Sequence, residues 1–409
     1  MLRSLVAVAT AFFLSIMSIA SAERVNLTYV EDAPAPIGKL TQADFDTMAA
    51  SDFTHFVFAF INFCTPASGG KFDCPGTDPE VVWNINAISD PDGSAKKMMQ
   101  GLSAAGKTIY ISIGGAWNDE TWAYFANATS AESSAAMTAL STFMDAYSVI
   151  GIDLDFEPHD YTKYPNLNRG YQNFASAIAS NLTPTPPVSI APYNCGGATE
   201  LIWQYCNLTG SSNIQPALIN RQYYAGGAQC ENWKGPSSKM PSQVVAAIKA
   251  DLGKHSCQDG NLVNVTQAQM NPGLATYGSL GGEPKYWDQA NCEASGTGTS
   301  MYSGCAEIVS AVVDAYDEIA GAAFWQYTSL ADQTTYADEI GTALGSSASK
   351  SCFWLSNSTD EWVPAPQAPV MSRGRCQLLD SCQPGGGKQS GGGCYKWTIN
   401  ASDPQNQWN

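Results

Sequence analysis

Three carboxylates alternate with apolar residues in the segment VIGIDLDFEPHD, residues 149–160. In a strand, Asp153, Asp155 and Glu157 would share one face, because side chains two positions apart point the same way. Burying three unpaired carboxylates is costly, so we expect them to share protons and hydrogen bonds, with at least one pKa raised toward neutrality. Acids with shifted pKa values are the groups that general acid–base catalysis requires.

The order of the three acids indicates which one reacts. Glu157 comes last, directly before Pro158 and a polar loop, so we expect it at the carboxyl end of the strand as the most exposed member. Barrels of parallel strands build their active sites at that end. Glu157 is therefore the candidate for proton transfer to a substrate.

Seven further apolar runs of strand length accompany this one, and helix-like segments separate them. The eight predicted strands are residues 25–30, 55–63, 108–115, 149–157, 187–193, 217–224, 273–278 and 321–327. The predicted helices are residues 41–50, 95–106, 133–148, 170–182, 241–253 and 305–320, with Gly106 and Gly253 at helix ends.

Eight such alternations predict an α/β fold, a (β/α)8 TIM barrel, whose parallel strands are buried on both faces. The acidic face of residues 149–157 must then be the barrel interior. A doubly wound open sheet is the alternative fold. It would need a glycine-rich phosphate loop after its first strand, and the segment YVEDAPAPIG is not one.

The composition divides the chain into three parts. Residues 1–22 combine one Arg, an apolar stretch and the ending Ala20-Ser21-Ala22, which is typical of a cleaved signal peptide. The barrel is expected over residues 23–345, with no large insertion domain before its last strand, which favours an open groove. Residues 346–409 are a short Cys/Gly/Pro-rich C-terminal extension, either a small carbohydrate-binding appendage or a loosely ordered linker.

Cysteines and sequons indicate a secreted protein, extracellular or in the cell wall. The chain has 12 Cys, an even number that suits disulfides, and Asn-x-Ser/Thr sequons. The sequons begin at Asn26, Asn127, Asn181, Asn207, Asn264, Asn357 and Asn400. Proximity in sequence predicts the disulfide pairs Cys64–Cys74, Cys195–Cys206, Cys230–Cys257 and Cys292–Cys305.

Charge and motif content argue against several classes of function. A formal net charge of −17 makes phosphate backbones poor partners, so we expect no nucleic acid, and also no membrane partner and a monomeric protein. Only 3 His are present, and no His/Cys spacing resembles a zinc site, so we expect neither a metal nor a cofactor. No G-x-S-x-G motif frames a nucleophilic serine.

Four motifs, in order and on the expected strands, resemble those of glycoside hydrolase family 18, the chitinase-type barrels. GIDLDFE (151–157) resembles the D-G-x-D-x-D-x-E signature of the fourth strand, and SIGG (112–115) resembles the S-x-G-G motif of the third. RQYY (221–224) resembles the sixth-strand element, and AAFWQY (322–327) resembles the eighth strand, which ends in a Trp beneath the sugar. The resemblance covers roughly residues 24–345.

The resemblance implies a role for each matching residue. Glu157 would be the general acid and later the base, while the N-acetyl carbonyl of the substrate would act as nucleophile with retention of configuration. Asp155 would orient the acetamido nitrogen and share a proton with Asp153. Tyr224 would donate to the acetamido oxygen, and Trp325 would form the apolar floor of the sugar subsite.

Other positions matching the family's groove would bind substrate, with ordinary barrel packing as the alternative for each. They are Tyr29, Phe60, Gly115, Trp117, Tyr193 and Gln222. Two residues depart from the family pattern. Ile150 replaces the first Asp of the signature, so the supporting hydrogen bonds of the row must come from elsewhere, and Ala225 follows Tyr224 where Asp or Asn is usual.

The resemblance implies a secreted chitinase that cleaves β-1,4-linked N-acetylglucosamine polymers internally, so chitin or its oligosaccharides would be the binding partner. An endo-β-N-acetylglucosaminidase acting on N-glycans is one alternative, because the same chemistry serves both. A non-catalytic chitin-binding lectin is another, although such relatives typically lose the terminal Glu that is kept here as Glu157.

Overall fold

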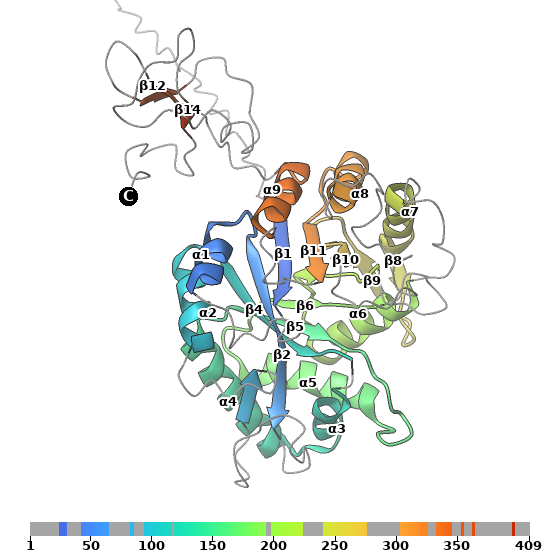
Figure 1. Ribbon diagram of the computed structural model, residues 1–409. Helices are drawn as coiled ribbons and strands as arrows, with labels where there is room; N and C mark the ends of the chain where they lie inside the picture. Colours follow the sequence, from blue (N-terminus) through green and yellow to red (C-terminus); the bar gives the residue numbers. More distant parts are fainter. Residues whose placement is uncertain are drawn as a thin grey trace, which may run out of the picture.

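A computed structural model describes residues 24–30, 42–64, 82–85, 94–116, 118–193, 198–223, 240–275, 303–325, 333–345, 353–355, 362–364 and 395–396. The predicted (β/α)8 barrel is confirmed (Figure 1). Its eight strands are β1 (Val25–Val30), β2 (His55–Cys64), β4 (Thr108–Gly114), β5 (Gly151–Asp155), β6 (Val188–Ile190), β7 (Leu218–Ile219), β10 (Gly273–Ala275) and β11 (Gly321–Trp325).

The strands are parallel and follow the order β10-β11-β1-β2-β4-β5-β6-β7. Two parallel bridges, Ile219 with Met270 and Gln222 with Gly273, join the two ends of this order and close the barrel. In that ring β11 lies opposite β5. All eight strands coincide with predicted segments, because strands buried on both faces are continuous apolar runs.

Six helices match predicted segments. They are α1 (Gln42–Ala50), α2 (Ser94–Ala104), α4 (Ser130–Tyr147), α5 (Leu167–Asn181), α7 (Met240–Asp251) and α8 (Ser303–Ala315). The last prediction was too long, since α8 ends at Ala315 and not at residue 320. Gly106 (φ +82°) and Gly253 (φ +103°) follow helix ends in a conformation that favours glycine, as expected.

Three further helices were not predicted: α3 (Asp119–Asn127), α6 (Thr199–Ser212) and α9 (Gln333–Ala343). Helix α6 is rich in Thr, Ser, Asn and aromatic residues, which have modest helix propensity. Its buried residues Leu201, Gln204, Tyr205 and Leu208 nevertheless follow helical spacing. Packing against the barrel therefore stabilises a helix that propensity alone does not indicate.

The remaining strands were also not predicted. Strand β3 (Val82–Ile85) pairs antiparallel with β2, and β8 (Gly253–Ser256) forms a hairpin with β9 (Leu262–Val265). In the C-terminal extension, β12 (Phe353–Leu355) pairs antiparallel with β13 (Trp362–Pro364) and β14 (Tyr395–Lys396). None of the described helices is long and apolar enough to cross a bilayer.

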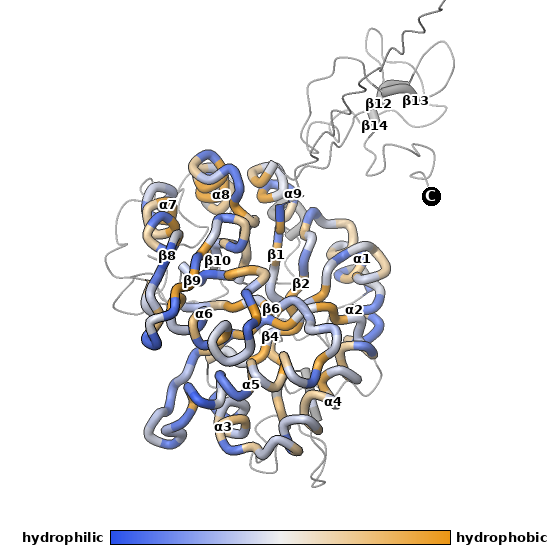
Figure 2. The backbone as a smooth tube through the Cα atoms, turned by 180° about the vertical axis from the view of Figure 1, so that it is seen from behind, coloured by the Kyte–Doolittle hydropathy of each residue, from blue (hydrophilic) through white to orange (hydrophobic). Residues whose placement is uncertain are grey.

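The core has two layers, one on each face of the barrel wall. Ile152, Leu154 and Phe156 point outward and pack under the helices. A smaller interior cluster consists of Leu27, Tyr29, Val57, Ala59, Tyr110, Leu218 and Ala323. Figure 2 shows hydrophobic stretches gathered on the central strands. The alternation seen in residues 149–157 thus separates the helix-facing layer from the barrel interior, as predicted.

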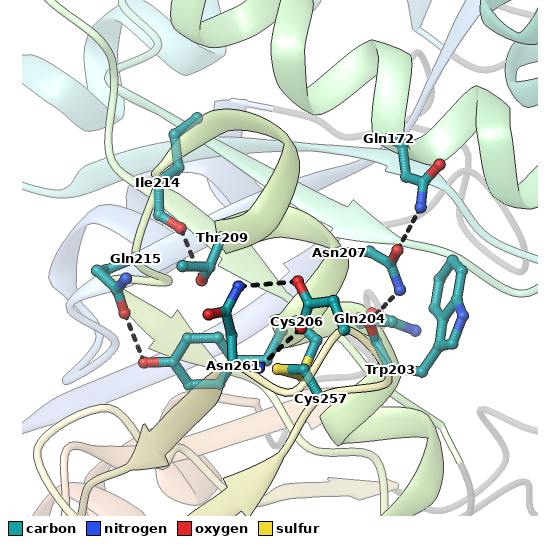
Figure 3. The surroundings of a disulfide bond; sticks show 12 residues. Gln172, Trp203, Gln204, Cys206, Asn207, Thr209, Ile214, Gln215, Cys257 and Asn261 are labelled. Atoms are coloured by element: carbon teal, nitrogen blue, oxygen red, sulfur yellow. Dashed lines mark hydrogen bonds between the residues drawn. A yellow bond between two sulfur atoms is a disulfide. The ribbon is translucent and has the colours of Figure 1, made fainter.

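The disulfide pairing expected from sequence proximity was wrong for two pairs. Cys206 on α6 bonds to Cys257, which follows β8, across 51 residues (Figure 3). This excludes both Cys195–Cys206 and Cys230–Cys257. The pairing follows from the fold, because α6 packs beside the β8–β9 hairpin. Cys74 and Cys292, members of the other two predicted pairs, lie outside the described residues, as does the predicted signal peptide.

Candidate active site

The three acids enter the barrel interior at the carboxyl end of β5, and their exposure rises along the strand. Asp153 is fully buried, Asp155 is 3% exposed and Glu157 is partly exposed. The expectation that Glu157 is the most exposed member is confirmed.

Asp153 accepts four side-chain hydrogen bonds. Ser189 Oγ (2.6 Å) and Asn220 Nδ2 (3.1 Å) donate to Oδ1, and Ser112 Oγ (2.8 Å) and Tyr29 OH (3.1 Å) donate to Oδ2. Burial raises the pKa of Asp153, and these four hydrogen bonds oppose the rise. Neighbouring strands on both sides therefore hold this carboxyl group in one orientation.

Ile150, which departs from the family signature, is 53% exposed and precedes β5, so the hydrogen bonds that hold Asp153 come from other segments. The hydrogen-bond network continues behind Asn220, because Asn271 Nδ2 donates to Asn220 Oδ1 (2.8 Å). Sequence analysis did not assign Ser189, Asn220 or Asn271. Each is a polar residue within or beside an otherwise apolar strand segment, and that pattern was the available signal.

Gln222 connects Asp155 and Glu157. Its Nε2 atom lies 3.0 Å from each of Asp155 Oδ1, Glu157 Oε1 and the carbonyl oxygen of Ala191. Burial raises the pKa of Asp155 well above its ordinary value, and the charges of Glu157 and Asp153 raise it further. The pair can therefore hold a shared proton, as the alternating spacing predicted.

Four predicted positions, three aromatic and one glycine, lie close together at the carboxyl end of the barrel. The Trp325 ring lies 5.5 Å from Tyr29 and 5.7 Å from Phe60, and its plane is 26° from that of Phe60. Gly115 N–H donates to the Asp155 carbonyl (2.7 Å), and a Cβ at Gly115 would lie 2.4 Å from the Phe60 ring. Only glycine fits this close approach.

The other predicted residues are placed as follows. Tyr193 lies partly exposed in the loop after β6, and burial followed by the charges of Glu200 and Glu157 raises its pKa. Tyr29 is 3% exposed, so its visible role is to hold Asp153. Trp117 and Tyr224 lie outside the described residues, and their predicted roles stay predictions.

A residue that sequence analysis missed fixes the loop beyond Glu157. Asp119, at the start of α3, accepts the backbone N–H groups of His159 (3.0 Å) and Asp160 (2.8 Å). Behind the next loop, buried Arg221 pairs with Asp251 (3.2 Å) and donates to the Tyr193 carbonyl (2.6 Å). The contacts of Asp119 and of Arg221 join residues far apart in sequence, so no local sequence pattern could reveal them.

A separate cleft of about 680 Å³ lies outside the barrel, between α5, α6 and the β8–β9 hairpin. Its lining includes Trp203, Gln172 and Asn207 and the Cys206–Cys257 disulfide (Figure 3). It contains none of the predicted site residues. Among the described residues, no group of His, Cys, Asp and Glu is arranged to hold a metal ion.

The arrangement combines a buried acid pair, a partly exposed carboxyl group and a cluster of aromatic rings, which suits acid-catalysed cleavage of a sugar bond. Comparison with curated proteins found no match. Solved structures similar to the chain include a GH18 chitinase from Pseudoalteromonas aurantia, with 13% identity over 78% of this chain and 99% of that chain, at a TM-score of 0.47.

Two other solved structures have similar values. The catalytic domain of a family GH18 chitinase from the fern Peteris ryukyuensis is 15% identical over 78% of this chain and 98% of that chain, at a TM-score of 0.49. A fungal endo-β-N-acetylglucosaminidase from glycosyl hydrolase family 18 is 15% identical over 78% of this chain and 95% of that chain, at a TM-score of 0.48. These values are too low to carry an argument about substrate.

The family itself is shown by sequence. The model of the glycosyl hydrolases family 18 matches residues 29–280, more than half of the chain. This range includes the acid row and Gln222. The chain therefore belongs to glycosyl hydrolases family 18 and is a glycoside hydrolase.

Proposed function

We propose that the protein is a secreted chitinase that hydrolyses β-1,4 links within N-acetylglucosamine polymers, with retention of configuration. The observation that carries this proposal is the coupled pair of Asp155 and Glu157 on one amide donor, Gln222, at the open end of the barrel. Two neighbouring carboxyl groups in different environments can differ in protonation. This suits a reaction in which one acid donates a proton while the substrate's acetamido group attacks the anomeric carbon.

Each step uses a named group of the chain. Glu157 protonates the glycosidic oxygen as the bond to the anomeric carbon breaks, and the acetamido carbonyl oxygen closes a ring on that carbon. Asp155 accepts a hydrogen bond from the acetamido N–H and stabilises the positive charge, while Asp153 supports Asp155 from behind. Glu157 then removes a proton from water, which opens the ring and restores the starting configuration.

The Glu157→Gln variant tests the acid–base role. We expect its kcat on a soluble chitin hexasaccharide to fall by roughly 10²- to 10⁴-fold, because the amide cannot transfer the proton. Product analysis by chromatography and by NMR of the fresh anomer should give β-anomers from the wild type. Undiminished activity in the variant, or inversion in the wild type, contradicts the mechanism.

The substrate class needs its own comparison. Colloidal chitin and a glycoprotein bearing N-glycans should be offered to the wild type in parallel. Release of chitin oligosaccharides supports the chitinase, and release of intact glycans supports an endo-β-N-acetylglucosaminidase instead. Binding to chitin without any product after long incubation would identify a lectin.

A further inference from the structure

Two residues without an assigned role lie on the connections that follow β5 and β6. Tyr161 is in the loop after β5, and Glu200 is in the first turn of α6, which follows β6. Strands β5 and β6 pair directly, with Leu154 opposite Ile190, so their two following connections leave the barrel next to one another. Both residues therefore belong to the same rim of the open end.

Glu200 is tied to the catalytic strand through one amide group. Nε2 of the fully buried Gln204 lies 3.2 Å from Glu200 Oε1 and 3.2 Å from the carbonyl oxygen of Phe156, the residue before Glu157. Burial raises the pKa of Glu200, the Gln204 hydrogen bond and the Arg221 charge oppose the rise, and the Glu157 charge adds to it. The two glutamates are close enough to influence each other.

Tyr161 presents an exposed ring that is held in place. It is 46% exposed, and its hydroxyl donates to Asn168 Oδ1 (2.9 Å) on α5. The preceding residue, Asp160, is fixed by Asp119. Burial of the remaining surface and then the charge of Glu200 raise the pKa of Tyr161 to about 12, with Tyr193 contributing next. Tyr161 follows β5, and Tyr193 and Glu200 follow β6, so all three lie on neighbouring connections at the rim.

We propose that Tyr161, Tyr193 and Glu200 form the subsite for the sugar that leaves when the glycosidic bond breaks. The inference rests on the proposed function, in which Glu157 touches the oxygen of the leaving sugar. Trp325, the expected floor of the subsite for the sugar that forms the cyclic intermediate, lies on β11, opposite β5 in the ring. The leaving sugar must then lie beyond Glu157, where these three residues gather.

The chemistry of the group matches a neutral pyranose. The C–H face of a sugar ring is apolar and packs on an aromatic ring, as an exposed and fixed tyrosine allows. Sugar hydroxyls donate to a carboxylate, and such charge-assisted hydrogen bonds are the stronger kind. The binding energy of the leaving sugar in this subsite would help to stabilise the transition state of polymer cleavage.

Two substrates separate this subsite from the rest of the site. A chitin hexasaccharide places sugars on both sides of the cleaved bond, whereas the 4-nitrophenyl glycoside of N,N′-diacetylchitobiose has a leaving group without sugar. We expect Tyr161→Ala and Glu200→Ala each to lower kcat/KM on the hexasaccharide roughly tenfold, equal to ~1.4 kcal/mol. The loss on the aryl glycoside should be at least about fivefold smaller.

Tyr147→Ala is the matched control. Tyr147 is a half-buried tyrosine at the end of α4, at the amino end of the strands, where it stacks on Phe143. This variant should turn over both substrates like the wild type. Melting temperatures check that each variant is folded, and Tyr161→Phe, which keeps the ring, should lose less activity than Tyr161→Ala.

The outcomes are distinct. Equal losses on both substrates, no loss on the hexasaccharide, or a greater loss in Tyr161→Phe than in Tyr161→Ala would overturn the subsite while leaving the chitinase in place. A wild type that cleaves neither substrate would instead refute the proposed function.

Discussion

Asp153 and Asp155 are buried alike but have different partners, and this difference separates their roles. Asp153 is surrounded by four neutral donors, whereas Asp155 shares one amide with Glu157 and faces the charges of both other acids. The pKa of Asp155 is therefore raised well above its ordinary value. A carboxyl group kept protonated in this way can give its hydrogen bond to Glu157 or accept one from a substrate.

This arrangement should reduce stability at high pH. Because the folded-state pKa of Asp155 lies above its unfolded value, the group favours folding below the unfolded pKa, and this contribution is lost as pH rises through the folded pKa. We expect Asp155→Asn to be more stable than the wild type at pH 8, by about 1–3 kcal/mol, with little difference near pH 3.

Urea unfolding at several pH values measures this difference. Asp145→Asn, at an exposed position on α4, is the control and should follow the wild-type pH dependence. A stability difference for Asp155→Asn that stays constant between pH 3 and pH 8 would contradict the assignment of the raised pKa.

At the scale of elements, α6 links the site to the outside of the barrel. Its first turn contributes Glu200, its second contributes Gln204, and Cys206 then bonds to Cys257 beyond the β8 strand. Asn261, labelled in Figure 3, lies in the hairpin turn, where its backbone N–H and its side-chain amide both donate to Asp259. The disulfide thus holds a helix of modest propensity against a two-stranded hairpin, which is marginal by itself.

We expect the double variant Cys206→Ser/Cys257→Ser to lose about 2–4 kcal/mol of unfolding free energy, because the bond closes a long loop of the unfolded chain. Thermal or denaturant unfolding of both proteins under non-reducing conditions measures the loss. Adding a reductant to the wild type should move its stability toward that of the variant. If the variant and the wild type were equally stable without reductant, the disulfide would contribute nothing to stability.

At the scale of the whole molecule, barrel closure decides which sequons can carry a glycan. Asn26 on β1 is fully buried, and its Nδ2 donates to the carbonyl oxygens of Asp52 and Ala337, so both amide hydrogens are used. Asn264 on β9 is exposed. Both have the same Asn-x-Thr pattern, and only their position in the fold distinguishes them.

We therefore expect the protein secreted from a eukaryotic host to carry a glycan on Asn264 and none on Asn26. Glycopeptide mass spectrometry of the folded, active fraction measures the occupancy of each site. A glycan on Asn26 in that fraction would contradict the burial of β1, and an empty Asn264 would contradict secretion through a glycosylating route.

The barrel and the acid row can be predicted from the amino-acid sequence alone. Eight strands buried on both faces are visible as apolar runs. The spacing of Asp153, Asp155 and Glu157 predicts a common face, because side chains in a strand alternate every two residues. Gln222 and Trp325 were also predicted to line the substrate groove, through their resemblance to family motifs. These features depend on local periodicity or on contiguous motifs, which a sequence displays directly.

The surroundings of those acids, by contrast, depend on how the chain folds. Ser189 and Asn220 donate to Asp153 from separate segments, and Asn271 donates to Asn220 behind them. Asp119 fixes the loop beyond Glu157, and Cys206 pairs with Cys257 across 51 residues. Each of these contacts arises when closure of the barrel brings distant segments together. Local periodicity does not encode such contacts, because their geometry depends on the packing of the whole chain.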